Sequence, residues 1–187
     1  MIDVALKEWH LLCQALIHGE QAILLRKGGI LEANNEFELE YRRFLLYPTY
    51  IHQQVTHVKP EWQGRIEQRA AEPEKIALAG YAEAVKIFEV PSRAAFEQLD
   101  DLHMWAKPLI DMRFSYRPEK PLYLVVVRAF KLAAPLVIDN TPEYAGCKSW
   151  VPLAQTVDVS GATPALAEAR VAAVVERIGR TFAEARP

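Results

Sequence analysis

The stretch that decides the fold is AILLRKGGILEANNEFELEYRRFLLYPTYIHQ, residues 22–53. It opens with the apolar run 22–25, which has the length of a short buried strand. Residues 37–42 alternate apolar and charged side chains with the two-residue period of a half-buried strand. A third apolar run, 44–47, ends at Pro48, which has no N–H for a strand ladder. We therefore expect a meander of three short strands, around which the rest of the chain packs.

Two chain reversals separate these expected strands. Gly28 and Gly29 form the first, because glycine adopts positive φ without a Cβ clash, and Asn34 and Asn35 form the second. The turn ends of the meander then carry polar and aromatic side chains: Arg26, Lys27, Thr49, Tyr50, His52 and Gln53.

Length and charge limit the class of protein. The chain has 187 residues, which suits one sizeable core and is awkward for two, so we expect a single α+β domain over residues 1–187. Its formal net charge of −2 argues against strong nonspecific binding of nucleic acid over the whole surface. A local basic patch remains compatible with that charge.

The cysteines and the N-terminus exclude further classes. Cys13 and Cys147 are the two cysteines and form no CxxC pair, so the sequence favours neither a disulfide framework nor a structural zinc site. We expect no cofactor. Asp3, Lys7 and Glu8 interrupt the N-terminus before any long apolar run, which argues against a signal peptide. No stretch approaches the roughly 18 apolar residues that a membrane span needs. The expected location is the cytoplasm, with no membrane partner.

Helices are expected on both sides of the meander. Asp3 is placed to cap an N-terminal helix that ends at Gly19, with Trp9 and Leu12 on its apolar face. A C-terminal helix is expected over 163–185 because its apolar residues recur at helical spacing. The polar segment 59–75, bounded by prolines, is expected to be an exposed insertion or a boundary between sub-domains, with one helix over 61–71.

The middle of the chain alternates strand and helix signals. Ser92 is placed to cap a helix that runs to about Leu102. Its β-branched residues make 122–131 the strongest strand signal in the chain. The other expected strands are 81–90, 112–116 and 136–138.

Several motifs together resemble a known family. They are Ala5-Leu6-Lys7-Glu8-Trp9, Leu25-Arg26-Lys27-Gly28-Gly29-Ile30, Tyr47-Pro48-Thr49 with His52-Gln53, and Tyr144, Gly146-Cys147 and Ser149-Trp150. From Val4 to Leu153 the chain is similar to the bacterial family known as domain of unknown function 1802. The family has no established activity. Some relatives carry the domain beside a restriction-endonuclease-like catalytic domain, which implies a role near restriction–modification and a separate restriction-endonuclease-like protein as partner.

The leading candidate site is a nucleic-acid patch. Cations neutralise phosphates and aromatic rings stack on bases, and both kinds of residue gather at the expected strand ends. The residues assigned to phosphate are Arg26, Lys27, Arg42, Arg43, Arg113 and Arg117, and those assigned to the flanks of the groove are Tyr50, His52, Gln53 and Trp150. The alternative is that these cations pair with glutamates on a solvated sheet face.

Three further sites were weighed. Glu36, Glu38 and Glu40 share one strand face and suggest a metal-dependent nuclease, although the same pattern describes the wet side of a strand. Cys147 beside Lys148 suggests a nucleophilic thiol, against the commoner buried cysteine. A small-molecule pocket under a loop at Trp150, lined by Trp9, Tyr47 and Trp105, cannot be separated from core packing by sequence.

The expected architecture is an α+β fold with a curved, mostly antiparallel sheet flanked by N-terminal and C-terminal helices. Its short strands admit closure into a small barrel like the PUA barrels that bind RNA or modified bases, an analogy of fold alone. The expected function is a non-enzymatic module that binds DNA or RNA and is linked to DNA restriction or defence. The alternatives are the nuclease and a structural protein that dimerises through the C-terminal helix, and the oligomeric state stays open.

Overall fold

The computed structural model describes residues 1–27, 40–146 and 148–185. The strands are β1 (Ile2–Trp9), β2 (Ile23–Arg26), β3 (Arg43–Thr49), β4 (Lys75–Glu89), β5 (Tyr123–Asp139), β6 (Trp150–Val157) and β7 (Thr163–Pro164). The helices are α1 (His10–Ile17), α2 (Pro60–Gln63), α3 (Arg93–Glu97), α4 (Lys107–Ser115) and α5 (Glu168–Glu184). Short 3₁₀ turns cover Val55–His57, Asp100–Leu102 and Pro142–Tyr144.

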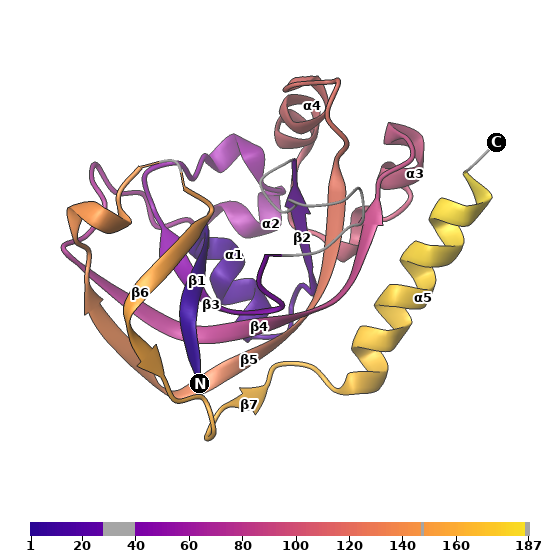
Figure 1. Cartoon of the computed structure of the whole chain (residues 1–187). Helices are drawn as coiled ribbons and strands as arrows, with labels where there is room; N and C mark the ends of the chain where they lie inside the picture. Colours follow the sequence, from indigo (N-terminus) through magenta and orange to yellow (C-terminus); the bar gives the residue numbers. More distant parts are fainter. Residues whose placement is uncertain (28–39, 147, 186–187) are drawn as a thin grey trace.

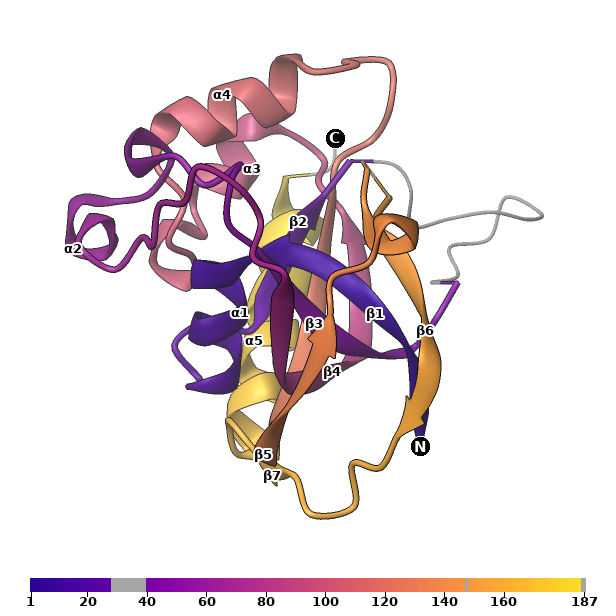
Figure 2. The same ribbon diagram turned by 90° about the vertical axis from the view of Figure 1, so that its left-hand side faces the viewer.

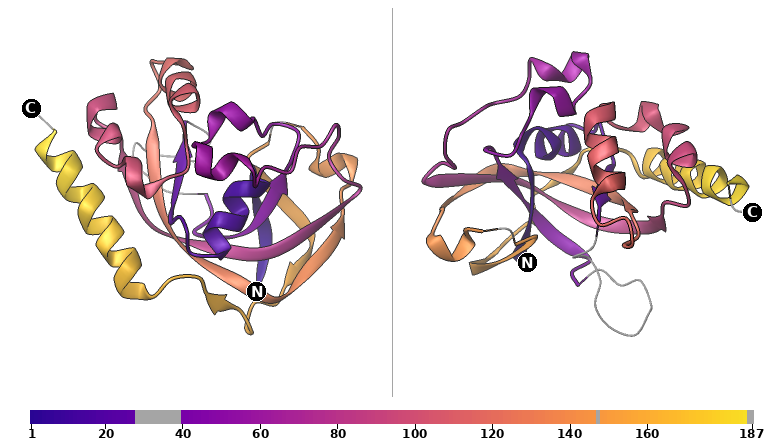
Figure 3. Two further views of the ribbon diagram at one scale, coloured as in Figure 1. Left: turned by 180° about the vertical axis from the view of Figure 1, so that it is seen from behind. Right: turned by 90° about the horizontal axis from the view of Figure 1, so that it is seen from above.

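The strands form one strongly curved sheet in the order β2-β5-β4-β3-β1-β6, with β7 added to β5 (Figure 1). The β1–β3 pair is parallel and the other pairs are antiparallel. Helix α1 lies within the curve and contacts β1, β3, β4 and β5, while α5 packs against β4 and β5 (Figures 1 and 3). The predicted α+β class and mostly antiparallel curved sheet are therefore confirmed.

The first segment of the chain is a strand, so the predicted helix from Asp3 is wrong. β1 lies between β3 and β6 in the sheet, and Val4, Ala5 and Leu6 are all buried. Such a run suits a central strand that is covered on both faces, and tertiary pairing overrides the helical spacing of its apolar residues. Helix α1 begins only at His10 and ends as expected at Gly19, which has φ of +71° and donates its N–H to the Leu16 carbonyl.

The predicted meander of neighbouring strands is also wrong. β2 and β3 both exist, but β5 and β4 lie between them in the sheet. Pro48 does not end the third run, because β3 continues to Thr49 and pairs Pro48 with Glu8 of β1. The turns at Gly28 and Asn34 and most of the expected middle strand lie outside the described residues. Pairing between strands far apart in sequence, which no local pattern reports, decides this topology.

Other boundaries shift for local reasons. The expected strand over 112–116 is part of helix α4, and the expected strands 122–131 and 136–138 merge into β5. Ser92 does cap α3, since its Oγ accepts the N–H of Ala95 at 3.1 Å, although the helix ends at Glu97. Helix α5 begins at Glu168 because the residues expected to start it, Thr163 and Pro164, form β7 against β5.

The segment 59–75 is exposed but anchored. Its only helix in the described chain is the one-turn α2, so the expected helix over 61–71 is wrong, and none of its residues is buried. The Glu72 carboxylate accepts the backbone N–H of Tyr50 at 2.9 Å, and the Glu67 carbonyl accepts from the Gln53 amide at 3.0 Å. These bonds tie the segment to the loop that follows β3.

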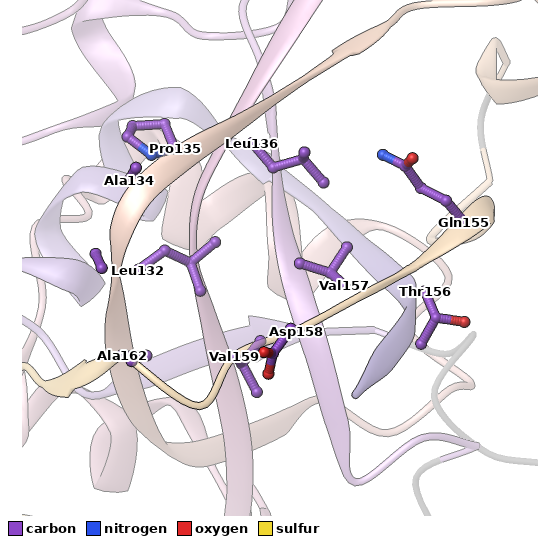
Figure 4. Close-up of a pocket in the computed structure, with 12 residues that line it drawn as sticks. Leu132, Ala134, Pro135, Leu136, Gln155, Thr156, Val157, Asp158, Val159 and Ala162 are labelled. Atoms are coloured by element: carbon purple, nitrogen blue, oxygen red, sulfur yellow. The ribbon is translucent and has the colours of Figure 1, made fainter.

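Two bulged strands keep the curved sheet open at one seam. In β5, residues 132–135 face the single residue Ala79 of β4, because the pairing shifts between Lys131–Gly80 and Leu136–Leu78. In β6, residues 153–156 likewise face Asp3 alone. A cavity of about 410 Å³ lies between the two bulged segments (Figure 4). Bulges bend strands and end pairing at barrel rims, so the two edges approach each other without forming a ladder.

A close helix–sheet contact fixes α1 in the curve. A Cβ at Gly80 would lie 2.4 Å from Cγ2 of Ile17 and 2.5 Å from the Phe130 carbonyl oxygen, so only glycine fits at this point of β4. In the described part of the chain, none of the helices has both the length and the apolar content needed to cross a bilayer.

Candidate functional site

Three of the cations singled out from the sequence meet where β1, β2 and α4 end. Arg26 Nη1 lies 2.6 Å from Glu8 Oε1, and the two side chains are 12% and 9% exposed. β1 and β2 are not neighbours in the sheet, since β5, β4 and β3 separate them. Glu8 and Arg26 nevertheless meet, because the sheet that carries β1 and β2 is strongly curved (Figures 1 and 2). We call Glu8, Arg26, Lys27 and Arg113 the Arg113 cluster.

Lys27 joins β2 to the C-terminal turn of α4. Its Nζ donates to the carbonyl oxygens of Arg113 at 3.0 Å and Phe114 at 3.3 Å. The last carbonyls of a helix lack intrahelical partners and carry the negative end of the helix dipole, so a lysine ammonium is well placed there. Lys27 therefore positions Arg113 as well as adding a positive charge.

Arg113 carries a half-buried guanidinium beside another guanidinium. Burial lowers its pKa and the neighbouring charge of Arg26 acts in the same direction, whereas Glu8 and Tyr116 oppose them. Among the described residues, Nε of Arg113 and Nη2 of Arg26 are buried and have no hydrogen-bond partner. The Arg113 cluster thus has three cations and one carboxylate.

The cleft beside Arg113 is narrow. Its volume is about 10 Å³, and its lining consists of Glu8, Trp9, Leu12, Leu25, Trp105, Leu109 and Arg113. A space of this size holds about one water molecule. A nucleobase does not fit inside, so a ligand of the Arg113 cluster has to approach from the mouth of the cleft.

Arg117 lies just beyond the end of α4, four residues after Arg113. Its guanidinium lies over the ring of Tyr116 at 5.3 Å from the centroid, and both residues are exposed. Arg117 has φ of 45° and is the one non-glycine residue with positive φ in the ranges that the structure describes. The end of α4 therefore gathers a second predicted cation and an exposed aromatic ring close to the Arg113 cluster.

Arg42 and Arg43 lie apart from this group. Glu8 is opposite Pro48, and Arg43 lies five residues before Pro48 in β3, a separation of about 16 Å along the strand. Arg43 Nε pairs with Glu83 at 2.9 Å and its guanidinium lies over the ring of Tyr81. Arg42 is exposed at the same end of β3. For Arg43, the pairing with a glutamate is the arrangement that the structure shows.

The residues after β3 support α1. Gln53 is buried, and its Oε1 accepts the N–H of Leu11 at 2.8 Å in the first turn of α1. Tyr50 stacks on His10 with ring centroids 4.7 Å apart, and burial lowers the pKa of His10. His52 is exposed nearby. The amide of Gln53 is thus engaged in capping a helix and holding segment 59–75.

Trp150 packs on β6, beside the strand that carries Glu8. Its ring meets those of Tyr41 and Phe44 edge to face, each with centroids 5.2 Å apart, and β6 places it opposite Leu6. Its buried Nε1 has no hydrogen-bond partner among the described residues. Cys147 lies outside the described residues. The ring contacts of Trp150 are thus with Tyr41 and Phe44, which do not belong to the Arg113 cluster.

The described part of the chain contains no group of three metal-binding side chains. Glu36 and Glu38, on which the nuclease alternative depended, lie outside it. The large cavity at the open seam is also unsuited to an anion, because its lining contains apolar side chains with Gln155, Thr156 and Asp158 and no cation (Figure 4). The Asp158 carboxylate already accepts from the N–H and the hydroxyl of Ser160, each at 3.0 Å.

Two functional contributions were missed from the sequence. Glu8 looked like one of several charges near the N-terminus, and nothing local indicated that it would neutralise Arg26. The capping role of Lys27 was equally hidden, because residues 112–116 were expected to be a strand and therefore offered no helix end.

Comparison with known proteins gives one family. Residues 5–177 match the model of the family described as domain of unknown function (DUF1802). No curated protein matches the sequence.

The chain is also similar to solved structures of ASCH from Zymomonas mobilis. The ASCH structure is 12% identical, with 92% of this chain and 93% of that chain covered and a TM-score of 0.45. A tyrosine-to-phenylalanine mutant is 10% identical, with 92% and 96% covered and a TM-score of 0.46. A serine-to-alanine mutant is 11% identical, with 95% and 99% covered and a TM-score of 0.43. No functional conclusion is drawn from likeness at this level.

Proposed function

The chain belongs to the family of domain of unknown function 1802, and we propose that it is a nucleic-acid-binding module that holds backbone phosphates at the Arg113 cluster. The observation that carries this proposal is the excess of positive charge at one half-buried place. Glu8 pairs with Arg26 and acts on the charge of Arg113, while Lys27 donates to the backbone of Arg113.

Phosphate oxygens at the mouth of the cleft would balance the positive charge of the cluster. Among the described residues, one N–H group of Arg26 and one of Arg113 have no hydrogen-bond partner, so neither guanidinium is fully paired within this part of the protein. Guanidinium groups bind phosphate through strong, charge-assisted hydrogen bonds. A bound phosphate would also reduce the repulsion between the two neighbouring guanidiniums.

The size of the cleft favours a backbone contact over an enclosed small molecule. Its volume of about 10 Å³ excludes a base or a nucleoside. After the end of α4, Arg117 and Lys120 are exposed cations, with the exposed Glu119 between them. A polyanion that passes over the mouth can meet these charges in turn, which is how proteins track a phosphate backbone.

The proposal also covers the biological context of the module and its lack of catalytic activity. The link to DNA restriction or defence, with a separate restriction-endonuclease-like protein as partner, rests on the family resemblance. The module itself is proposed to be non-enzymatic. Supercoiled plasmid incubated with the protein and Mg²⁺ or Mn²⁺ is expected to stay intact, and cleavage by the purified chain would instead favour the nuclease alternative.

The binding test uses a salt series and a matched pair of variants. Fluorescein-labelled single-stranded and duplex DNA and RNA are titrated by anisotropy from about 50 to 200 mM salt. Arg113→Gln removes the guanidinium of the cluster, and Arg43→Gln removes one from the distant end of β3, so the two variants have the same net charge. We expect Arg113→Gln to weaken binding about tenfold and to reduce the slope of log K against log salt by about 1.

Arg43→Gln is expected to change affinity less than twofold. The proposal fails if no probe binds at low salt, or if the two variants lose affinity equally, because general surface charge would then account for the binding.

A further inference from the structure

The end of α4 displays an aromatic ring that the fold does not use. Tyr116 is 51% exposed and is the one aromatic residue among the large hydrophobic side chains that are exposed in the described chain. The other tryptophan, tyrosine and phenylalanine residues of the described chain are buried or half-buried. A ring that is half exposed to solvent contributes little to stability, so the position of Tyr116 favours a role in binding.

Tyr116 is fixed next to the Arg113 cluster. Its backbone N–H donates to the Met112 carbonyl at 2.9 Å, which continues the last turn of α4. Arg113 lies three residues earlier, in the last turn of the same helix. A nucleotide whose phosphate lies at Arg113 would have its base within reach of this ring.

Arg117 holds the ring from one side at the cost of backbone strain. Its guanidinium lies 5.3 Å from the ring centroid of Tyr116, while its φ of 45° is a conformation that side chains other than glycine rarely adopt. Pro118 follows, which restricts the backbone of Arg117 further. Strain of this kind persists where the surrounding structure needs a particular side-chain position.

We propose that Tyr116 is a base-stacking residue, and that the ligand of the Arg113 cluster is single-stranded nucleic acid. This inference rests on the proposed function. One base stacks on the face of Tyr116 that Arg117 leaves open, and the adjacent phosphate lies at Arg113. In a duplex the faces of the bases are already stacked on one another, so only an unpaired strand can use the ring. DNA and RNA share this chemistry.

The test compares three variants at one position with a distant control. Tyr116→Phe keeps the ring, Tyr116→Leu keeps an apolar side chain without a ring, and Tyr116→Ala removes both. Val137→Ala is the control because Val137 is 56% exposed on β5, away from α4. Single strands of about 12 nucleotides, as DNA and as RNA, and the matching duplex are titrated by anisotropy.

The ring of Tyr116 should account for a preference for single strands over the duplex. We expect Tyr116→Leu and Tyr116→Ala to weaken single-strand binding about tenfold and duplex binding less than twofold. Tyr116→Phe and Val137→Ala are expected to bind all probes as the unchanged protein does. A larger effect with RNA than with DNA, or the reverse, would identify which strand is the ligand.

A second readout reports stacking directly. 2-Aminopurine placed at successive positions of the strand is quenched where it stacks, and we expect one quenched position that recovers in Tyr116→Ala. The inference is overturned if Tyr116→Ala binds single strands normally, or if it weakens duplex and single strand equally. If Arg113→Gln weakens every probe while Tyr116→Ala weakens none, the proposed function survives and this inference does not.

Discussion

Lys27 Nζ donates to the carbonyl oxygen of Arg113 across 3.0 Å and so joins the end of β2 to the last turn of α4. Both residues are cations, yet their roles differ. The ammonium of Lys27 is engaged with backbone carbonyls, whereas the guanidinium of Arg113 has an unpaired buried Nε among the described residues. Lys27 thus positions Arg113, and its removal should change both stability and nucleic-acid affinity.

The first prediction concerns Lys27. Lys27→Met keeps the aliphatic stem and removes both hydrogen bonds to the end of α4. We expect the free energy of unfolding to fall by about 1–2 kcal/mol, because two helix carbonyls lose a charged donor. Urea denaturation measures this change. Nucleic-acid affinity should fall as well, since Arg113 is no longer held in place. Lys86→Met, at an exposed position of β4, is the control and should change neither quantity.

The second prediction concerns the ion pair between Glu8 and Arg26. Glu8→Gln leaves the guanidinium of Arg26 without its carboxylate, 12% exposed and near Arg113. We expect a loss of about 3–5 kcal/mol, which is typical when one partner of a buried pair is removed. The double variant Glu8→Gln/Arg26→Gln should recover part of that loss in chemical denaturation. A loss below about 1 kcal/mol in the single variant would mean that the pair behaves as a surface contact.

The third prediction separates the structural role of Gln53 from a ligand role. Gln53→Ala leaves the N–H of Leu11 buried without its acceptor and releases the Glu67 carbonyl. We expect the protein to be about 1–3 kcal/mol less stable while nucleic-acid affinity at a folded temperature stays within twofold. Thermal melts and anisotropy titrations measure the two effects. If Gln53→Ala weakened nucleic-acid binding without changing stability, Gln53 would instead be a ligand-binding residue.

The fourth prediction is a dependence of stability on pH that comes from His103. This side chain is 5% exposed and stacks on Phe96 with centroids 4.9 Å apart, and burial lowers its pKa to about 4. Below pH 6.5 the unfolded chain therefore takes up a proton that the folded chain refuses. Stability falls as the pH drops through this window, and the penalty is complete below about pH 4.

The size of this effect follows from the shift in pKa. Between about pH 7 and pH 4.5, His103 should remove roughly 2–3 kcal/mol of stability. His103→Phe keeps a ring for stacking and removes the titrating group, so its stability should fall less over the same range. Urea denaturation at each pH measures both proteins. Other groups, such as His10 and His57, titrate equally in both and cancel in the difference. Parallel curves for the two proteins would contradict the prediction.

Local patterns predicted those parts of the fold that depend on neighbours in sequence. The β-branched run in β5, the Ser92 cap, the glycine at the end of α1 and the apolar face of α5 were all identified correctly. They could be predicted because a cap or a run of branched residues acts within a few positions. The N-terminal strand was missed because its apolar spacing also fits a helix, and only its place between β3 and β6 distinguishes the two.

The candidate site divides in the same way. The sequence identified Arg26, Lys27, Arg113 and Arg117 as cations near aromatic residues, and the structure brings the first three together. The sequence alone could not distinguish these cations from Arg43, which pairs with Glu83 at the other end of β3. Glu8 went unnoticed as a partner, because the pair with Arg26 joins strands that are separated by three others in the sheet.

By itself, then, the sequence determined the α+β class, the strongest strand and the C-terminal helix, and it identified the cations that became candidates for a site. Only the tertiary structure decided the order of the strands and which cations share one site. The physical reason is range: caps, turns and side-chain periodicity act over a few residues. The curvature that brings β1 and β2 together comes from twist and bulges accumulated across the whole sheet.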